Sequence, residues 1–127
     1  ETLLSESDFV TLHVPLTDRT HHLIDEVALA KVKVGATLIN CARGPVVSEL
    51  GLVNALRSGH IGGAGLDVFE IEPPPTPNPF ADFPNVVLTP HHAPSTRDTM
   101  IVKFKEIFAN ADRFFNGERM ENEISLI

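Results

Sequence analysis

The sequence predicts an α/β protein in which a parallel sheet is flanked by helices. Short apolar segments alternate with amphipathic ones along most of the chain, which is the order of strand–helix–strand units. The connections between these segments are short, so we expect right-handed crossovers and helices on both faces of the sheet. Three predicted strands end in side chains that carry chemistry: an arginine, acids and a histidine.

Composition narrows the class of protein. The 127 residues amount to one modest domain or part of a larger one, and a hydrophobic fraction of 43% suits a globular core. The net charge of −7 predicts no nucleic-acid partner, because such binding needs clustered lysine and arginine. No apolar run approaches the roughly 18 residues of a membrane span, which predicts no membrane partner. A single cysteine excludes an internal disulfide framework and predicts a cytoplasmic location.

The first third of the chain predicts a helix end, a strand and a short helix. Residues 1–8 lack an initiator methionine and have the pattern of a helix already under way, so we expect a fragment of a longer protein. Residues 9–15 predict a buried strand closed by a proline, which cannot donate to a ladder. Asp25 is a suitable N-cap for a helix that runs through Lys33 and has Gly35 as its C′ residue.

The middle of the chain predicts two strands around one helix. The strands are expected over residues 37–41 and 61–69, and Ser48 is a suitable cap for a helix over residues 49–58. Gly51 inside that helix costs roughly 1 kcal/mol relative to alanine, so we expect packing to hold the helix together.

The last third predicts a strand and the clearest helix. Residues 73–79 are too rich in proline for regular structure, and a strand is expected over residues 86–89. Ser95 and Asp98 have capping-box spacing before the helix, which ends at residues 116–117. Its apolar stripe is wider than this half-sheet needs, so we expect it to pack on a second domain. The stripe consists of Met100, Ile101, Phe104, Ile107, Phe108, Ala111, Phe114 and Phe115.

The chemically active side chains follow the predicted strands. Arg43 comes after the second strand, where a guanidinium should face something anionic. Asp67 lies in the third strand and is followed by Glu70 and Glu72, and His91 follows the fourth strand. Because ligands of open α/β sheets bind at the carboxyl ends of the strands, these residues predict one site.

Four segments resemble the D-isomer-specific 2-hydroxyacid dehydrogenases, a family that includes phosphoglycerate, glyoxylate/hydroxypyruvate and D-lactate dehydrogenases. In order, they are SDFVTLHVPLT, KVKVGATLINCARGPVV, GAGLDVFEIEP and NVVLTPHHA. The resemblance implies a partial Rossmann-like sheet whose first βαβ unit is missing, since the chain contains no GxGxxG loop. It assigns residues 1–95 to the second half of the NAD(P)-binding domain. Residues 96–127 would be a C-terminal helix and tail that returns to an absent substrate domain.

The resemblance implies three catalytic residues. Arg43 would hold the substrate carboxylate, which suits the bidentate donors of a guanidinium. His91 would be the general acid/base and Glu72 the carboxylate that orients it, with Glu70 as the nearby rival. An extended strand would point His91 and His92 to opposite faces, and alignment on the preceding Thr-Pro selects His91.

The resemblance also implies binding of NAD, with NADP left open because its determinant follows a strand absent from this sequence. Asp67 would lie near the nicotinamide carboxamide, although an acid that caps or turns a strand explains it too. Cys41 is not expected to be a nucleophile, because no base is paired with it in the sequence. The full set of expected cofactor-binding residues is His13, Val14, Pro15, Thr17, Cys41, Ala42, Arg43, Asp67, His91 and Ala93.

No metal site is predicted, because the adjacent histidines at 21–22 and 91–92 lack ligand spacing. The leading hypothesis is an oxidoreductase that transfers a hydride between a nicotinamide cofactor and a small D-2-hydroxy or 2-keto acid, as a homodimer when intact. One alternative is a dehydrogenase-like corepressor that senses NAD. Another is a non-catalytic binding or oligomerisation module. The sequence of the substrate domain would separate the first two hypotheses, and a turnover assay would test the third.

Overall fold

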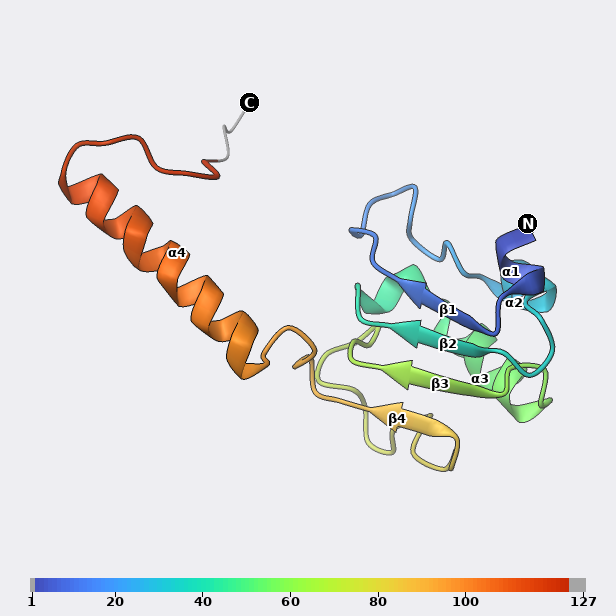
Figure 1. Ribbon diagram of the computed structural model, residues 1–127. Coiled ribbons are helices and arrows are strands. Elements are labelled where there is room, and N and C mark those ends of the chain that lie inside the picture. The colour runs from blue at the N-terminus through green and yellow to red at the C-terminus, as the bar shows by residue number, and fades with distance from the viewer. Residues whose placement is uncertain (1, 124–127) are drawn as a thin grey trace. The chain divides into compact units, whose positions relative to one another are not determined.

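The computed structural model describes residues 2–123, and the chain divides into two compact units, Glu1–His91 and His92–Ile127. The first unit contains a four-stranded sheet in which all neighbouring strands are parallel, as the sequence predicts. The arrows of Figure 1 accordingly all point the same way. In spatial order the strands are β1 (Phe9–Leu12), β2 (Thr37–Asn40), β3 (Gly63–Leu66) and β4 (Val86–Leu88).

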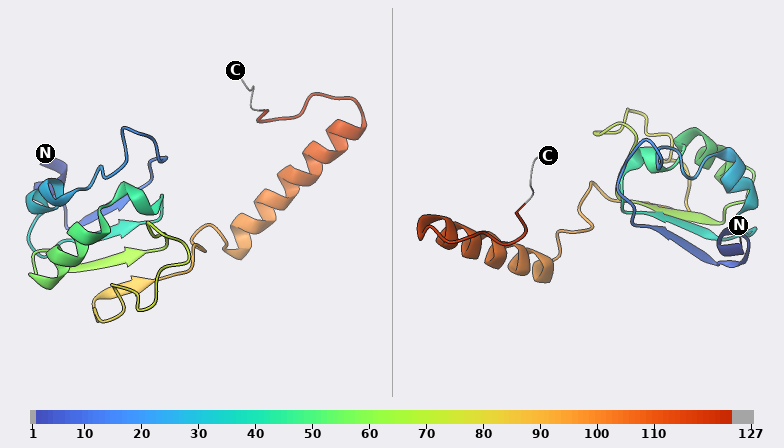
Figure 2. Two further views of the ribbon diagram at one scale, coloured as in Figure 1. Left: turned by 180° about the vertical axis from the view of Figure 1, so that it is seen from behind. Right: turned by 90° about the horizontal axis from the view of Figure 1, so that it is seen from above.

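Helices α2 (Glu26–Lys31) and α3 (Glu49–Arg57) of the first unit cover one face of this sheet (Figure 2). Short helix α1 (Thr2–Glu6) precedes β1, α2 joins β1 to β2, and α3 joins β2 to β3. The right-hand view of Figure 2 shows α2 and α3 on the same face. The prediction of helices on both faces is therefore wrong for this unit. Right-handed crossovers that always step in one direction, from β1 to β4, place successive helices on the same side.

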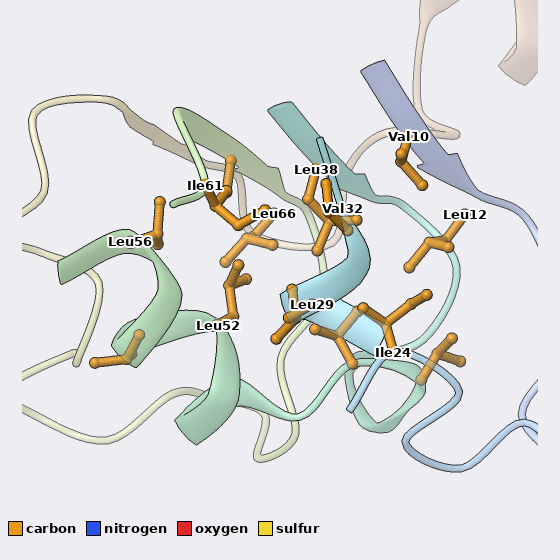
Figure 3. Close-up of a cluster of buried hydrophobic side chains, with 14 of the residues drawn as sticks. Val10, Leu12, Ile24, Leu29, Val32, Leu38, Leu52, Leu56, Ile61 and Leu66 are labelled. Atoms are coloured by element: carbon orange, nitrogen blue, oxygen red, sulfur yellow. The ribbon is translucent and has the colours of Figure 1, made fainter. Parts of the chain in front are cut away.

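The core lies between that face and the two helices (Figure 3). Val10, Leu38 and Leu66 of successive strands are buried, and Leu29 of α2 and Leu52 of α3 are buried with them. Burial alternates along β1, so its other face is open. Phe9 and Val87 there remain 69% and 67% exposed.

The strands are shorter than predicted at their carboxyl ends, and β3 also begins two residues later than predicted. The predicted strand over 9–15 ends at Leu12, and the one over 61–69 is confined to Gly63–Leu66. The helix predicted through Lys33 ends at Lys31, since Val32 turns extended with ψ of 142°. Gly35 has the expected positive φ of 83°, but it lies too far along to be the C′ residue.

The predicted cap and packing of α3 are confirmed. The Ser48 hydroxyl accepts a hydrogen bond from the Gly51 backbone N–H at 3.2 Å. A Cβ added at Gly51 would lie 3.1 Å from Glu26 Cγ and 3.2 Å from Leu29 Cδ1. The glycine therefore allows α2 and α3 to pack closely.

The second unit contains α4 (Arg97–Phe115), described here by itself. Thr96 caps it by accepting from Thr99 N–H at 3.4 Å, so the predicted capping box at Ser95 is displaced by one residue. The predicted end is confirmed, with Asn116 as C-cap and φ of 69° at the following glycine. None of the residues of α4 is buried. Within residues 2–123, no helix is long and apolar enough to span a membrane.

Candidate active site

A buried amide shapes the turn that carries Arg43. Asn40, the last residue of β2, is 1% exposed. Its side-chain Oδ1 accepts from Ala42 N–H and its Nδ2 donates to the Arg43 carbonyl, both at 3.0 Å. Arg43 is exposed, and its Nη1 donates to the Ala42 carbonyl at 2.6 Å. Asn40 was not among the predicted site residues, although a polar residue that closes an apolar strand is a signal that could have identified it.

The turn after Arg43 packs on the loop that follows β3. Gly44 begins a short 3₁₀ helix, Gly44–Val46. A Cβ there would clash with the Phe69 carbonyl and lie 2.4 Å from Glu70 N. Only glycine permits this approach, which connects two of the strand ends that the sequence predicts to form one site.

Arg43 opens onto a hollow of about 520 Å³ at the carboxyl ends of β1 and β2. Its lining comes from two of the segments that are expected to bind the cofactor. Thr17, also expected there, is held just beyond, where its N–H donates to Thr20 Oγ1 at 2.8 Å. The hollow is lined by His13, Val14, Pro15, Leu16, Cys41, Ala42 and Arg43, of which only Leu16 was not predicted.

Asp67 directly follows β3 and is buried. It is 2% exposed, and its Oδ1 accepts from the Thr89 hydroxyl at 2.5 Å. Its backbone N–H donates to Asn40 O and its carbonyl accepts from His91 N–H, at 3.0 and 2.8 Å. Burial, aided by the charge of Asp67, raises the pKa of the Cys41 thiol. A thiol that stays protonated is a poor nucleophile, and this is a reason not to expect Cys41 to act as one.

His91 and Glu72 form a hydrogen-bonded pair in which His91 Nδ1 lies 2.8 Å from Glu72 Oε2. The rival acid, Glu70, instead contacts His22, whose Nε2 lies 3.0 Å from Glu70 Oε1. His91 has φ of 56°, in the left-handed region, so the assumption of an extended strand at this point is wrong. β4 has already ended at Leu88. A turn, rather than strand alternation, therefore directs the His91 side chain.

Glu72 is held as an anion. Its hydrogen bond with His91 is the main cause that lowers the pKa of the carboxyl, and the Phe69 N–H, 3.0 Å from Oε1, is the second. Burial opposes these two causes, and the charges of His91 and then Arg43 lower the pKa further. Glu72 and His91 share a smaller hollow of about 180 Å³ with Phe69, Pro73, Pro74 and Pro90.

We expect His91→Ala to raise the pKa of Glu72 toward its ordinary value near 4.5, since the main cause of the lowering is removed. A ¹³C titration of glutamate carboxyls in the 127-residue chain measures this. His92→Ala is the matched control and should leave Glu72 unchanged. Because the folded-state pKa is the lower one, Glu72 stabilises the fold above about pH 4.5 and that contribution is lost on acidification. An unchanged Glu72 pKa in His91→Ala would contradict the hydrogen-bonded pair.

The remaining expected residues lie elsewhere. Ala93 belongs to the second unit, two residues after His91. The rings of His21 and His22 contact each other, with centroids 4.2 Å apart. Over residues 2–123, no group of three or more histidine, cysteine or acidic side chains is placed to hold a metal ion.

Known proteins match this chain over most of its length. The sequence profile of the D-isomer-specific 2-hydroxyacid dehydrogenase NAD-binding domain matches residues 1–93. Glyoxylate reductase of Korarchaeum cryptofilum is 46% identical over 125 residues, which cover 98% of this chain and 38% of the relative.

Solved structures agree with these sequence matches. D-lactate dehydrogenase with NAD+ from Lactobacillus jensenii has a TM-score of 0.91 at 32% identity, covering 98% of this chain and 41% of its own. A D-isomer-specific 2-hydroxyacid dehydrogenase of Xanthobacter autotrophicus, in complex with NADPH and MES, has a TM-score of 0.77 at 42% identity. That match covers 96% of this chain and 50% of the other. The chain thus spans half or less of each of these relatives, and it belongs to the D-isomer-specific 2-hydroxyacid dehydrogenase family through its NAD-binding domain.

Proposed function

We propose that this chain supplies the acid/base and substrate-anchoring residues of an enzyme that interconverts a small D-2-hydroxy acid and its 2-keto acid. The observation that carries the proposal is the Glu72–His91 pair, with Nδ1 and Oε2 2.8 Å apart. It lies beyond the carboxyl end of β4, on the sheet edge where α/β proteins bind ligands. Membership of the NAD-binding domain family alone would support cofactor binding. The Glu72–His91 pair supports catalysis as well.

The pair can move a proton at a defined atom. Because Glu72 engages Nδ1, the Nε2 atom of His91 is left for the substrate. In oxidation, neutral Nε2 accepts the hydroxyl proton, and in reduction it returns one to the carbonyl oxygen. Glu72 fixes the ring and stabilises the imidazolium that forms. Because a carboxylate can only accept, neutral His91 carries its proton on Nδ1 in this contact.

Arg43 and its hollow suit the other half of the reaction. The exposed guanidinium offers two parallel donors to a substrate carboxylate. Cys41 and Ala42 are small, and Val14, Pro15 and Leu16 are apolar, which suits the flat face of a nicotinamide ring. When bound, a nicotinamide cofactor donates or accepts the hydride. The proposed cofactor is NAD or NADP. Residues 1–95 would be the second half of its domain, and residues 96–127 a helix and tail that return to a substrate domain.

The proposal is tested in an exchange enzyme: K. cryptofilum glyoxylate reductase in which this chain replaces the aligned 125-residue stretch. We expect NADH- or NADPH-dependent reduction of glyoxylate or another small 2-keto acid, with stoichiometric oxidation of the cofactor. Cofactor binding without turnover of any small 2-keto acid would favour the NAD-sensing corepressor. Gel filtration tests the proposed homodimer, and the proposed location is the cytoplasm, in keeping with one free cysteine.

The 127-residue chain alone should bind NAD weakly and show no dehydrogenase activity. The anion site of dinucleotide-binding proteins is a glycine-rich loop at a helix N-terminus, and this sequence contains no GxGxxG. Isothermal titration calorimetry of the chain with NAD measures the affinity, with the exchange enzyme as the positive control. Micromolar binding by the chain alone would contradict this expectation.

A further inference from the structure

We propose that Glu70 is a positioning residue, which clamps the Glu72 loop to the start of α3 and so keeps Glu72 within reach of His91. Its importance for catalysis rests on the proposed function, but the clamp itself does not. The loop is the short segment after β3 that contains Phe69 and both acids. Glu70 was expected only as a rival to Glu72, and its contacts give it a separate role.

The clamp consists of two reciprocal hydrogen bonds. Glu70 Oε1 accepts from the backbone N–H of Glu49 at 2.9 Å, and Glu49 Oε1 accepts from the backbone N–H of Glu70 at 2.7 Å. Glu49 is the first residue of α3, where backbone N–H groups lack partners within the helix. Two main-chain donors are thereby satisfied by two side chains 21 positions apart.

A third element joins the clamp. His22 Nε2 lies 3.0 Å from the same Glu70 Oε1, and the His22 backbone N–H donates to the Pro45 carbonyl at 2.7 Å. Pro45 lies in the 3₁₀ turn that directly follows Arg43. Glu70 therefore connects the loop before α2, the turn after Arg43 and the loop that carries Glu72.

Charge attraction does not explain why two acids face each other here. Burial raises the pKa of the Glu49 carboxyl and the Glu70 carboxylate adds to that rise, while the bond from Glu70 N–H opposes it. Two carboxylates that face each other repel. We therefore attribute this arrangement to its effect on the position of the loop. The same loop supplies the Phe69 N–H to Glu72 Oε1, one residue from the clamp, which makes Glu72 the side chain that the clamp positions.

The test measures the Glu72 pKa by ¹³C titration of the 127-residue chain. Glu70→Ala removes the acceptor, and we expect the pKa of Glu72 to rise toward 4.5 as its contacts with His91 and Phe69 N–H loosen. Loss of a nearby negative charge alone would lower that pKa, so the two explanations predict opposite signs. Glu70→Gln keeps an oxygen acceptor and should retain the low value.

Two further variants complete the experiment. Glu26→Ala is the matched control, because its carboxylate bonds the Ser48 hydroxyl at the same end of α3 without touching the loop. It should leave the Glu72 pKa unchanged. Glu49→Ala removes one of the reciprocal bonds and should also raise the Glu72 pKa. It replaces Glu70→Ala as the test if that variant fails to fold. Folded Glu70→Ala or Glu49→Ala with a low Glu72 pKa would overturn the clamp. No outcome depends on turnover, so failure of the exchange enzyme as a reductase would leave this result intact.

Discussion

His91→Gln should lower kcat/KM of the exchange enzyme by roughly 10²–10⁴-fold, the usual loss when a general acid/base is removed. One limb of the pH profile should flatten, because no group remains to exchange the proton with substrate oxygen. The structure gives this expectation its geometric basis. The turn at His91 directs Nδ1 to Glu72 at 2.8 Å, so Nε2 is the atom proposed to exchange the proton with substrate.

His92→Gln is the matched control, since it makes the same substitution one residue further along. We expect its kcat/KM to stay within about tenfold of the parent and its pH dependence to be intact. If the two results were reversed, the wrong histidine would have been assigned. If neither substitution mattered, the dehydrogenase mechanism would fail and the NAD-sensing hypothesis would gain. Glu72→Gln adds an internal check, because the loss should be smaller than for His91→Gln when a group that only orients the base is replaced.

The local parts of this fold could be predicted because local signals determine them. Ser48 and Asp25 are caps, and each accepts a backbone N–H three residues ahead, as capping side chains do. Parallel pairing followed from strand–helix–strand order. The number of covered sheet faces could not be predicted in the same way, because it depends on the direction in which successive strands are added.

The contacts that organise the candidate site are distant in the sequence. His91 and Glu72 are 19 positions apart, and His22 and Glu70 are 48 apart. Helical or strand periodicity reports neighbours within about four residues, so it cannot pair these groups. The positive φ of His91, 56°, is likewise a feature that periodicity does not report. The resemblance to a known family supplied the names of the site residues, whereas the clamp made by Glu49 and Glu70 required the structure.

The second large effect is expected at Arg43. Its carbonyl is bound by the buried Asn40 amide and the following glycine packs on the Phe69 backbone, so the position of the backbone is rigidly determined. The side chain is exposed beside the hollow of about 520 Å³. Lysine at this position would keep the charge while losing the planar fork of donors.

Arg43→Lys should therefore lower kcat/KM of the exchange enzyme for a 2-keto acid at least about tenfold, because a charge-assisted hydrogen bond is worth about 1.5–3 kcal/mol. Both KM and kcat should worsen, since the guanidinium is proposed to hold the carboxylate and to polarise the reacting oxygen. Arg57→Lys, an exposed arginine in the last turn of α3, is the matched control and should have near-parental kinetics. Calorimetry of cofactor binding separates loss of substrate contacts from loss of cofactor contacts, because Arg43 also lines the hollow proposed for the cofactor. Near-parental kcat/KM in Arg43→Lys would remove Arg43 from the substrate site, and weakened cofactor binding alone would reassign it to the cofactor.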